Sequence, residues 1–452
     1  MHALLQNRLA LATTDRQCNT STRLLSATLL SLSLAGGCAA QTTSAQTELL
    51  RSANPEFTNS AVAVAWNQIA VDAAKTYDGI QDFAVNVRGF TMMHLAMHDA
   101  LNSIHPVYER YAFMGKLEPH AQPAVAAAQA AHDVLVHIYP AQQSTLDSEL
   151  ESSLARIPNG TRKQLGVQLG KDAAAAIISE RRSDAWDSVG SYAPKSNPRP
   201  GDYQFVPPLE MVFRPGFADA KPFAISDRTQ FRGPPPPDLS SSAYASAYNE
   251  VKAFGAKNGS SRSQDQTNEA LWWYEFAEGI WNRIASVLAR QHDLKLYPAA
   301  RMFALVNMGI ADAYVAIWDA KRFYDRWRPY TAIRAGDTDG NQATDPDPTW
   351  EPLCVTPPVT EYPSAHAIQS AAAAEMLIAA LDTEAISFTT TSRTAPPDRP
   401  ERSFTSPQAA AAEAADSRVM CGIHFRYATD VGLEQGRALA RSILDRKLRP
   451  RH

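Results

Sequence analysis

Three short stretches in the second half of this chain carry the residue types that an oxyanion site needs. They are Lys321 with Arg328-Pro329, the run Pro363-Ser364-Ala365-His366, and Ser417-Arg418 with His424. Lysine and arginine can neutralise a multiply charged oxyanion, and an arginine fork matches two tetrahedral oxygens at once. Of the two histidines, one can serve as ligand or nucleophile and the other as acid and base.

The run Pro363–His366 is typical of a helix start, because Pro363 stops any upstream helix and Ser364 can cap the apolar segment Ala367–Leu381. Unpaired backbone N–H groups and the positive end of the helix dipole make such a start an anion site. Taken alone, the same four residues favour an ordinary capped helix with an incidental histidine, because matches of four residues occur by chance. The stretches on either side favour the first interpretation.

Spacing within the other two stretches predicts how their side chains are oriented. Lys321 and Arg328 are seven residues apart, which is two helical turns, so we expect both on one face of a helix that ends at Arg328 before Pro329. Six residues separate Arg418 from His424, which would place them on different helix faces. Gly422 lets the chain turn between them.

Composition places broad limits on the partners. The 452 residues include 43 Lys and Arg against 47 Asp and Glu, a net charge of -4. This balance indicates neither a nucleic-acid partner nor a membrane-surface protein. Within the expected helix Tyr297–Arg322, the longest uncharged apolar stretch, Met302–Ala311, is too short to span a bilayer.

The N-terminus is typical of an export signal. The apolar segment Leu24–Leu34 follows two arginines and precedes small residues and Cys38, so we expect residues 1–40 to be a signal peptide. Cleavage before Cys38 would give a lipoprotein anchored at that residue, in the periplasm or on a membrane. Cleavage after Ala40 would release a secreted protein. Residues 41–59 are polar and predict a flexible linker.

Three-and-four apolar spacing dominates the rest and predicts an all-α protein without a substantial β-sheet. A long segment rich in proline, glycine and aromatic residues, Ser188–Asp238, predicts an ordered loop or a seam between two helical halves. The expected helices are Ala61–Ala74, Val87–Ile104, Ala124–Ile138, Gln142–Ala155, Arg162–Arg182, Ser242–Phe254, Gln266–Gln291, Tyr297–Arg322, Ala367–Leu381 and Tyr427–Lys447. Thr389–Pro407 is expected to be a loop.

Three further features each have two interpretations. His94 and His98 with Asp99 could bind a metal, but a packed, hydrogen-bonded helix is the expectation because no ligand triad accompanies them. The aspartate-rich segment Ala335–Pro352 lacks the glycine and glutamate of a calcium loop and predicts turns. Cys354 and Cys421 are either a disulfide that braces the site or two free thiols.

In order and spacing, the three stretches resemble the signature of vanadium-dependent haloperoxidases and the related acid and phosphatidic acid phosphatases: K-x6-R-P, P-S-G-H and S-R-x5-H. The wider sequence, over most of residues 60–448, resembles the bacterial vanadium chloroperoxidase-like branch. That resemblance implies two packed helical bundles. They would cover residues 60–240, including the Pro-rich loop, and 241–452, with the site in the second.

The resemblance also implies roles. Lys321, Arg328, Ser364, the Ala365 amide and Arg418 would hold vanadate, with His424 bound to the metal and His366 as acid and base. Peroxide would replace a vanadate oxygen while His366 takes its proton. Lys321 would polarise it for attack by halide, which releases hypohalous acid. The oligomeric state is not predicted.

Two alternatives accompany this expectation. In a phosphatase, phosphate would occupy the same site, His424 would attack the phosphorus of a phosphomonoester and His366 would protonate the leaving alcohol. The second alternative is a helical protein that binds an oxyanion but catalyses no reaction. Three positions depart from the signatures: Ala365 replaces glycine, Ala428 stands where the phosphatases have an aspartate, and Val359 where haloperoxidases often have Phe or His.

Overall fold

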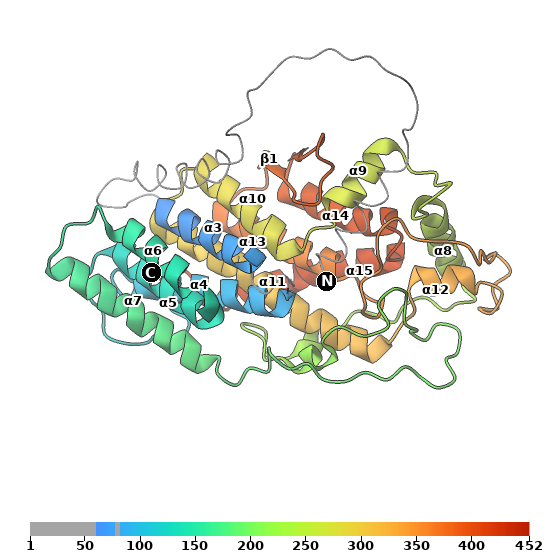
Figure 1. Ribbon diagram of the computed structural model, residues 1–452, viewed down its shortest axis with the longest axis horizontal. Coiled ribbons are helices and arrows are strands. Elements are labelled where there is room, and N and C mark those ends of the chain that lie inside the picture. The colour runs from blue at the N-terminus through green and yellow to red at the C-terminus, as the bar shows by residue number, and fades with distance from the viewer. Residues whose placement is uncertain (1–59, 77–81, 452) are drawn as a thin grey trace, which may run out of the picture.

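The computed structural model describes residues 60–76 and 82–451, so the expected signal peptide and linker lie outside the described residues. The fold is all-α, with two packed groups of helices along an elongated molecule (Figure 1). The first half contains α3 (Ala61–Thr76), α4 (Phe83–Asn102), α5 (Pro123–Ile138), α6 (Gln143–Leu154) and α7 (Thr161–Glu180). The second contains α8 (Ser242–Phe254), α9 (Gln264–Trp272), α10 (Ala277–Gln291), α11 (Leu296–Tyr324), α12 (Pro329–Arg334), α13 (Ala365–Leu381), α14 (Pro407–Met420) and α15 (Arg426–Leu444).

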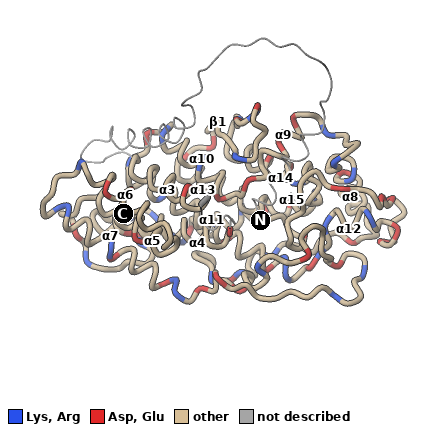
Figure 2. The backbone as a smooth tube through the Cα atoms, viewed as in Figure 1, with Lys and Arg blue, Asp and Glu red and all other residues tan. Residues whose placement is uncertain are grey.

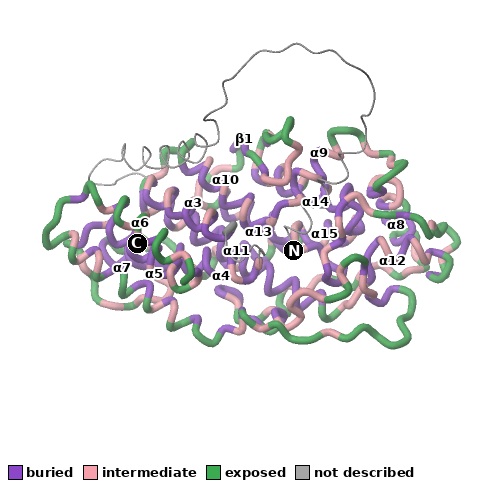
Figure 3. The backbone as a smooth tube through the Cα atoms, in the orientation of Figure 1, coloured by how far each residue is buried: buried purple, intermediate pink, exposed green. Residues whose placement is uncertain are grey.

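Helix α11 is the central element, because it packs against α4 of the first half and against α10, α13 and α15 of the second. Its length and apolar composition would suffice to cross a membrane, but 94% of that apolar window is buried inside the fold. One continuous hydrophobic core therefore runs through both halves. Figure 3 shows buried backbone along the middle of the molecule and exposed backbone mainly in the outer loops.

Helices α13 and α15 approach closely because α15 has glycines where it crosses α13. A Cβ added to Gly432 would lie 2.8 Å from the Ala367 Cβ and 2.9 Å from the Ser364 carbonyl oxygen. At Gly436 it would lie 2.3 Å from the Ile368 carbonyl oxygen. The start of α13, with Ser364 and His366, is thus held directly against α15.

The Pro-rich segment 188–238 is an ordered connection, as predicted, and is tied to α11. Its short 3-10 helices are Pro215–Asp219 and Arg228–Phe231. The buried carboxylate of Asp312 accepts hydrogen bonds from three consecutive backbone amides of this segment, those of Phe223, Ala224 and Ile225, at 2.5–2.7 Å. Charged residues of both signs are distributed along the outer segments rather than over one face (Figure 2).

Two predicted elements differ from the structure. The single helix expected over Gln266–Gln291 is broken between α9 and α10, where Phe276 takes an extended conformation. Within the expected loop Thr389–Pro407, β1 (Phe388–Thr391) and β2 (Glu401–Phe404) form a small antiparallel sheet, with Phe388 opposite Phe404. Both phenylalanines are buried and their rings pack together. The strands were not predicted because four residues are too few to show an alternating apolar pattern.

The helix end predicted at Arg328 is also wrong. Helix α11 ends at Tyr324, because Asp325 adopts a left-handed conformation with φ of 48°. The following residues pair with the Pro-rich segment, since the Trp327 amide donates to the Gly201 carbonyl. Arg328 is extended and precedes α12, so it does not share a helix face with Lys321.

The three features with two interpretations, the histidines of α4, the aspartate-rich segment and the cysteine pair, each have defined partners in the structure. The His94 ring pairs with Asn67 and stacks on Phe303, while His98 pairs with the Glu109 carbonyl. The carboxylate of Asp99 accepts three backbone amides, so α4 is the packed, hydrogen-bonded helix that was expected. Asp339 and Asp347 bond to nearby turn residues in the manner of turns. Cys354 and Cys421 form a disulfide.

Candidate active site

Lys321 lies in the last turn of α11 and is buried. Its Nζ donates to the carbonyl oxygens of Thr360 and Glu361, at 2.6 and 2.8 Å. Burial, reinforced by the positive charge of Arg328, lowers the pKa of Lys321 well below its usual value, against the opposing effect of Glu361. An ammonium has three N–H donors, so one remains for a ligand.

Arg328 is also buried, and carbonyl oxygens from two loops fix its guanidinium. Nε donates to Val359 at 2.8 Å and one terminal nitrogen donates to Ile423 at 2.7 Å. The same terminal nitrogen lies 3.1 Å from Nε2 of His424. A guanidinium can only donate, so this Nε2 is unprotonated and accepts.

His424 is oriented from its other side by Glu361. Its Nδ1 lies 2.8 Å from Oε1 of Glu361, which also accepts the backbone amide of Phe425 at 3.1 Å. Nδ1 therefore carries the proton, and the Nε2 lone pair is the reactive one. Burial and then the charges of Arg328, Lys321 and Arg418 lower the pKa of His424 well below its usual value. Burial raises the pKa of Glu361 to about 7, against the opposing charges of Lys321 and Arg328.

His366 and Arg418 complete the set from α13 and α14. Nε2 of His366 donates to the carbonyl oxygen of Glu275 at 3.0 Å, which leaves Nδ1 as the free base. Burial and the charge of Arg418 lower the pKa of His366 to about 3. Arg418 is held by Ser417 and by the Trp273 carbonyl, at 3.0 and 2.7 Å, and burial lowers its pKa to about 10.

Ser364 and Ala365 begin α13 as the sequence predicts, but Ser364 does not cap the helix with its side chain. Its Oγ is buried and has no hydrogen-bond partner within the described chain. The Ser364 amide donates to the carbonyl of Ala428, the position at which the phosphatase signature has an aspartate. The free hydroxyl is therefore a donor that a ligand could engage.

The chemistry of these donors fits a bound oxyanion. Three buried cations, Lys321, Arg328 and Arg418, surround the two histidines, and Glu361 is the carboxylate bonded within the group. Buried charges are normally matched, so an anion of more than one negative charge would balance the excess. Vanadate and phosphate both meet this description.

A hollow of about 350 Å³ leads to Lys321. Trp318, Val359 and Thr360 line it beside Lys321, and the Pro-rich segment contributes Tyr192 and Val212 among others. Val359 is smaller than the Phe or His often found at this position in haloperoxidases, which leaves more room beside Lys321. Small substrates can reach the lysine by this route.

The structure brings together all seven predicted site residues, but sequence reasoning missed several of their partners. Glu361 lies two residues before the run Pro363–His366 and was assigned no role from the sequence. Nothing in its position three residues before Ser364 predicts a contact with His424, which only the fold creates. The carbonyls of Val359, Thr360, Trp273 and Glu275 were also missed, and the last two are presented by the unpredicted break between α9 and α10.

In fold, and in part of its sequence, the chain is similar to vanadium haloperoxidases. Residues 301–451 match the family described as VCPO second helical-bundle domain, which confirms the resemblance seen in the sequence. A curated relative, vanadium chloroperoxidase of Curvularia inaequalis, is 24% identical over an alignment of 405 residues. The alignment covers 72% of this chain. The match spans 66% of that relative, just under two thirds of its length.

Two solved structures share the fold. A bacterial vanadium-dependent iodoperoxidase is 23% identical, with a TM-score of 0.73 over 85% of this chain and 96% of its own. A holo-type bacterial vanadium-dependent chloroperoxidase is 18% identical, with a TM-score of 0.66 over 80% of this chain and 91% of its own.

Proposed function

We propose that this protein is a vanadium haloperoxidase that oxidises halide with hydrogen peroxide. The observation that carries the proposal is His424, whose unprotonated Nε2 faces buried cations while Glu361 fixes its Nδ1. That arrangement presents a metal-ligating lone pair inside a site that requires an anion. The vanadium-dependent relatives support vanadate as that anion.

Vanadate held there would supply the Lewis acid that makes hydrogen peroxide reactive toward halide. Arg328, Arg418 and Ser364 would neutralise and hydrogen-bond its oxygens, together with the Ala365 amide, and His424 would bind the metal through Nε2. Arg328 and Arg418 are already fixed by carbonyl oxygens, and the contact that binding must break is the hydrogen bond from Arg328 to Nε2 of His424.

His366 moves the proton in this proposal. Its Nε2–H is held by the Glu275 carbonyl, so Nδ1 is the atom that accepts a proton from incoming peroxide. Its low pKa keeps the ring neutral before peroxide arrives. Lys321 has one N–H free and borders the hollow, so it can polarise an oxygen toward a halide that enters beside Trp318.

A phosphatase acting through His424 is the second candidate, and one contact favours it. Ala428 occupies the position of the aspartate that the phosphatase signature provides, but Glu361 gives His424 the carboxylate contact that an attacking histidine needs. In this reaction Nε2 of His424 would bond to phosphorus as the ester oxygen leaves. His366, protonated once the negative charge of the bound phosphate offsets the charge of Arg418, would donate to that oxygen, and water would then hydrolyse the phosphohistidine.

We also propose that the chain is exported, to the periplasm, to a membrane through a lipid at Cys38, or to the medium. The sequence of residues 1–40 motivates this proposal. The disulfide between Cys354 and Cys421 supports it, because such bonds persist in oxidising compartments.

One purified sample assayed in two reactions tests the function. With added orthovanadate, we expect peroxide-dependent halogenation of a phenolic dye, and we expect phosphate to inhibit it by competition. Hydrolysis of an aryl phosphate that vanadate inhibits, without halogenation, would instead establish the phosphatase. Vanadate binding with neither reaction would leave the non-catalytic alternative.

His424→Ala should remove either activity, since it removes the ligand or nucleophile. His292→Ala is the matched control, because His292 is an exposed histidine at the end of α10. Full turnover by His424→Ala would show that the site lies elsewhere.

A further inference from the structure

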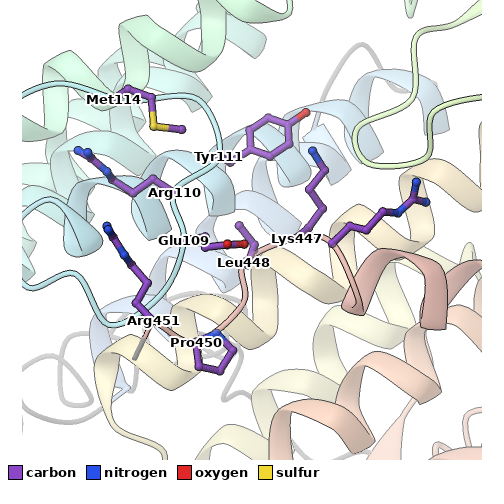
Figure 4. Close-up of a pocket in the computed structure, with 9 residues that line it drawn as sticks. Glu109, Arg110, Tyr111, Met114, Lys447, Leu448, Pro450 and Arg451 are labelled. Carbon is purple, nitrogen blue, oxygen red and sulfur yellow. The ribbon is translucent and has the colours of Figure 1, made fainter.

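A second cationic surface lies beside the first turns of α11, toward the opposite end of that helix from Lys321. It joins the loop after α4 to the segment after α15 and borders an open hollow of about 740 Å³ (Figure 4). Arg110, Arg446, Lys447 and Arg451 line the hollow, and we call these four residues the basic patch. In Figure 4 the side chains of Arg110, Lys447 and Arg451 surround Glu109.

Backbone hydrogen bonds hold the two segments of the basic patch together. The Glu109 amide donates to the Arg449 carbonyl, and the Arg451 amide donates to the Val107 carbonyl, both at 2.9 Å. Nε of Arg301 on α11 donates to the Leu448 carbonyl at 2.8 Å. The guanidinium of Arg110 is also fixed, since it donates to the Ser103 hydroxyl and the Gly115 carbonyl, both at 2.9 Å, and Arg446 bonds back to Ser442.

Charge within the basic patch is not balanced. Glu109 pairs with Arg449 at 2.6 Å, and this pairing lowers the pKa of Glu109. None of the four patch cations forms an ion pair within residues 60–76 and 82–451. Four cations thus remain after the carboxylate among them is neutralised, on a chain whose overall charge is -4.

Exposed apolar side chains belong to the loop that carries Arg110. Val107, Met114 and Leu117 are 42%, 64% and 49% exposed and belong to the same loop. Met114 lines the hollow, and Val107 is bonded through its carbonyl to Arg451. Large apolar side chains gathered next to unpaired cations are what an interfacial membrane contact requires, since the cations meet phosphate groups while the apolar groups enter the acyl boundary.

We propose that this surface docks on an anionic phospholipid bilayer. Phosphate groups would lie against Arg110, Lys447 and Arg451, and Met114, Val107 and Leu117 would enter the headgroup region. Charge complementarity favours the lipid phosphate, and the apolar side chains favour a bilayer over a dissolved anion. Net charge alone indicated no membrane surface, because the acidic residues elsewhere mask a local excess of cations.

Vesicle sedimentation with the full chain tests the proposal. The chain carries Cys38→Ser throughout, so that lipid attachment cannot contribute. We expect binding to phosphatidylcholine vesicles containing phosphatidylglycerol, several-fold weaker binding to phosphatidylcholine alone, and loss of the difference at high salt. Equal binding to both vesicles would overturn the proposal.

Two pairs of charge-removing substitutions test whether vesicle binding depends on the basic patch. Each cation near an anionic bilayer contributes about 1 kcal/mol, or about fivefold in partitioning, so Lys447→Gln with Arg451→Gln should weaken binding by at least about tenfold. Lys171→Gln with Arg399→Gln removes the same charge from exposed positions outside the patch and should change little. Equal losses in both pairs would overturn the proposal.

Met114→Ser with Leu117→Ser separates the bilayer from a dissolved anion. Both side chains are exposed, so folding should be unaffected, and we expect anionic-vesicle binding to fall several-fold. Unchanged binding in this variant, together with full displacement by inorganic phosphate, would show that the patch binds a free anion and would overturn the bilayer as its occupant.

Discussion

At the scale of single residues, Glu361 determines which nitrogen of His424 is available to a ligand. A histidine flanked by an arginine and a carboxylate can present only one nitrogen to a ligand, and here that nitrogen is Nε2. The carboxylate also adds negative charge to an anion site, which opposes binding. Its value must therefore lie in orienting His424 and not in electrostatic attraction.

Glu361→Gln tests this role. The amide preserves size but binds the imidazole N–H more weakly, so vanadate affinity should fall by about 10–100-fold while the melting temperature holds or rises. Vanadate titration and thermal unfolding measure the two effects. Glu278→Gln is the matched control, since Glu278 is a buried carboxylate on α10 bonded to Tyr314 outside the site. Unchanged vanadate affinity in Glu361→Gln would contradict the assignment.

Residue types and motif spacing were enough to predict which side chains meet. The predicted cluster rested on the order of three motifs and the family signature that they resemble. Apolar spacing predicted most of the helices, but not the break between α9 and α10 or the end of α11 at Tyr324. Glu361, by contrast, meets His424 across 63 positions of sequence, and the Trp273 and Glu275 carbonyls reach the site through a helix break. Such contacts depend on tertiary packing, which local pattern does not encode.

At the scale of elements, the loop 353–361 and the turn after α14 form one unit. The loop supplies the carbonyls that hold Lys321 and Arg328, and the turn supplies His424. The Cys354–Cys421 disulfide and the Cys354 amide, which donates to the Cys421 carbonyl at 3.1 Å, join them. The sequence alone could not decide between a disulfide and two free thiols, because two cysteines pair only if the fold brings them together.

Replacing both cysteines with alanine should destabilise the protein by about 2–4 kcal/mol, because the bond closes a long loop of 67 residues. Denaturant unfolding measures this loss. We also expect weaker vanadate binding, since the loop and the turn are no longer joined covalently. Reducing the native protein with a thiol should reproduce both effects, and a thiol effect on the alanine variant would point to another cause.

Gly422→Ala should be among the most damaging small substitutions near the site. Its φ is +78°, and an added Cβ would lie 2.4 Å from the Gly255 carbonyl oxygen. The strain and the clash together should exceed about 2 kcal/mol and should displace His424.

Gly259→Ala separates these causes, because Gly259 has a φ of +66° with nothing within 4 Å of an added Cβ. Its unfolding free energy should fall by about 1–2 kcal/mol with activity intact. Equal losses in the two variants would show that the close approach to Gly255 is unimportant.

At the scale of the whole molecule, buried ionisable groups of opposite kinds limit stability at both ends of the pH scale. Burial raises the pKa of Glu278 to about 7, and burial with the nearby Glu413 raises that of Glu269 to about 8. Burial lowers the pKa of His94 to about 3. The folded protein therefore holds protons on the acids more tightly than the unfolded chain, and on the histidine less tightly.

The sign of each effect follows. Stability contributed by the acids falls as pH rises from 4.5, their ordinary value, toward 7–8. Stability contributed by His94 falls as pH drops from 6.5 toward 3. We therefore expect maximal stability at about pH 5–6. Glu278→Gln should reduce the alkaline loss by about 3 kcal/mol, measured by denaturant unfolding across pH, and an unchanged slope would contradict this.

The dispersal of the oxyanion site over three segments has a consequence for synthesis. The ribosome delivers Lys321 and Arg328 first, then Glu361 and Ser364, and Arg418 and His424 only much later. A nascent chain therefore has no assembled cationic pocket while it is being made. If the chain is exported as proposed, this order keeps the pocket from capturing cellular phosphate before translocation, and the site is completed where the disulfide can form.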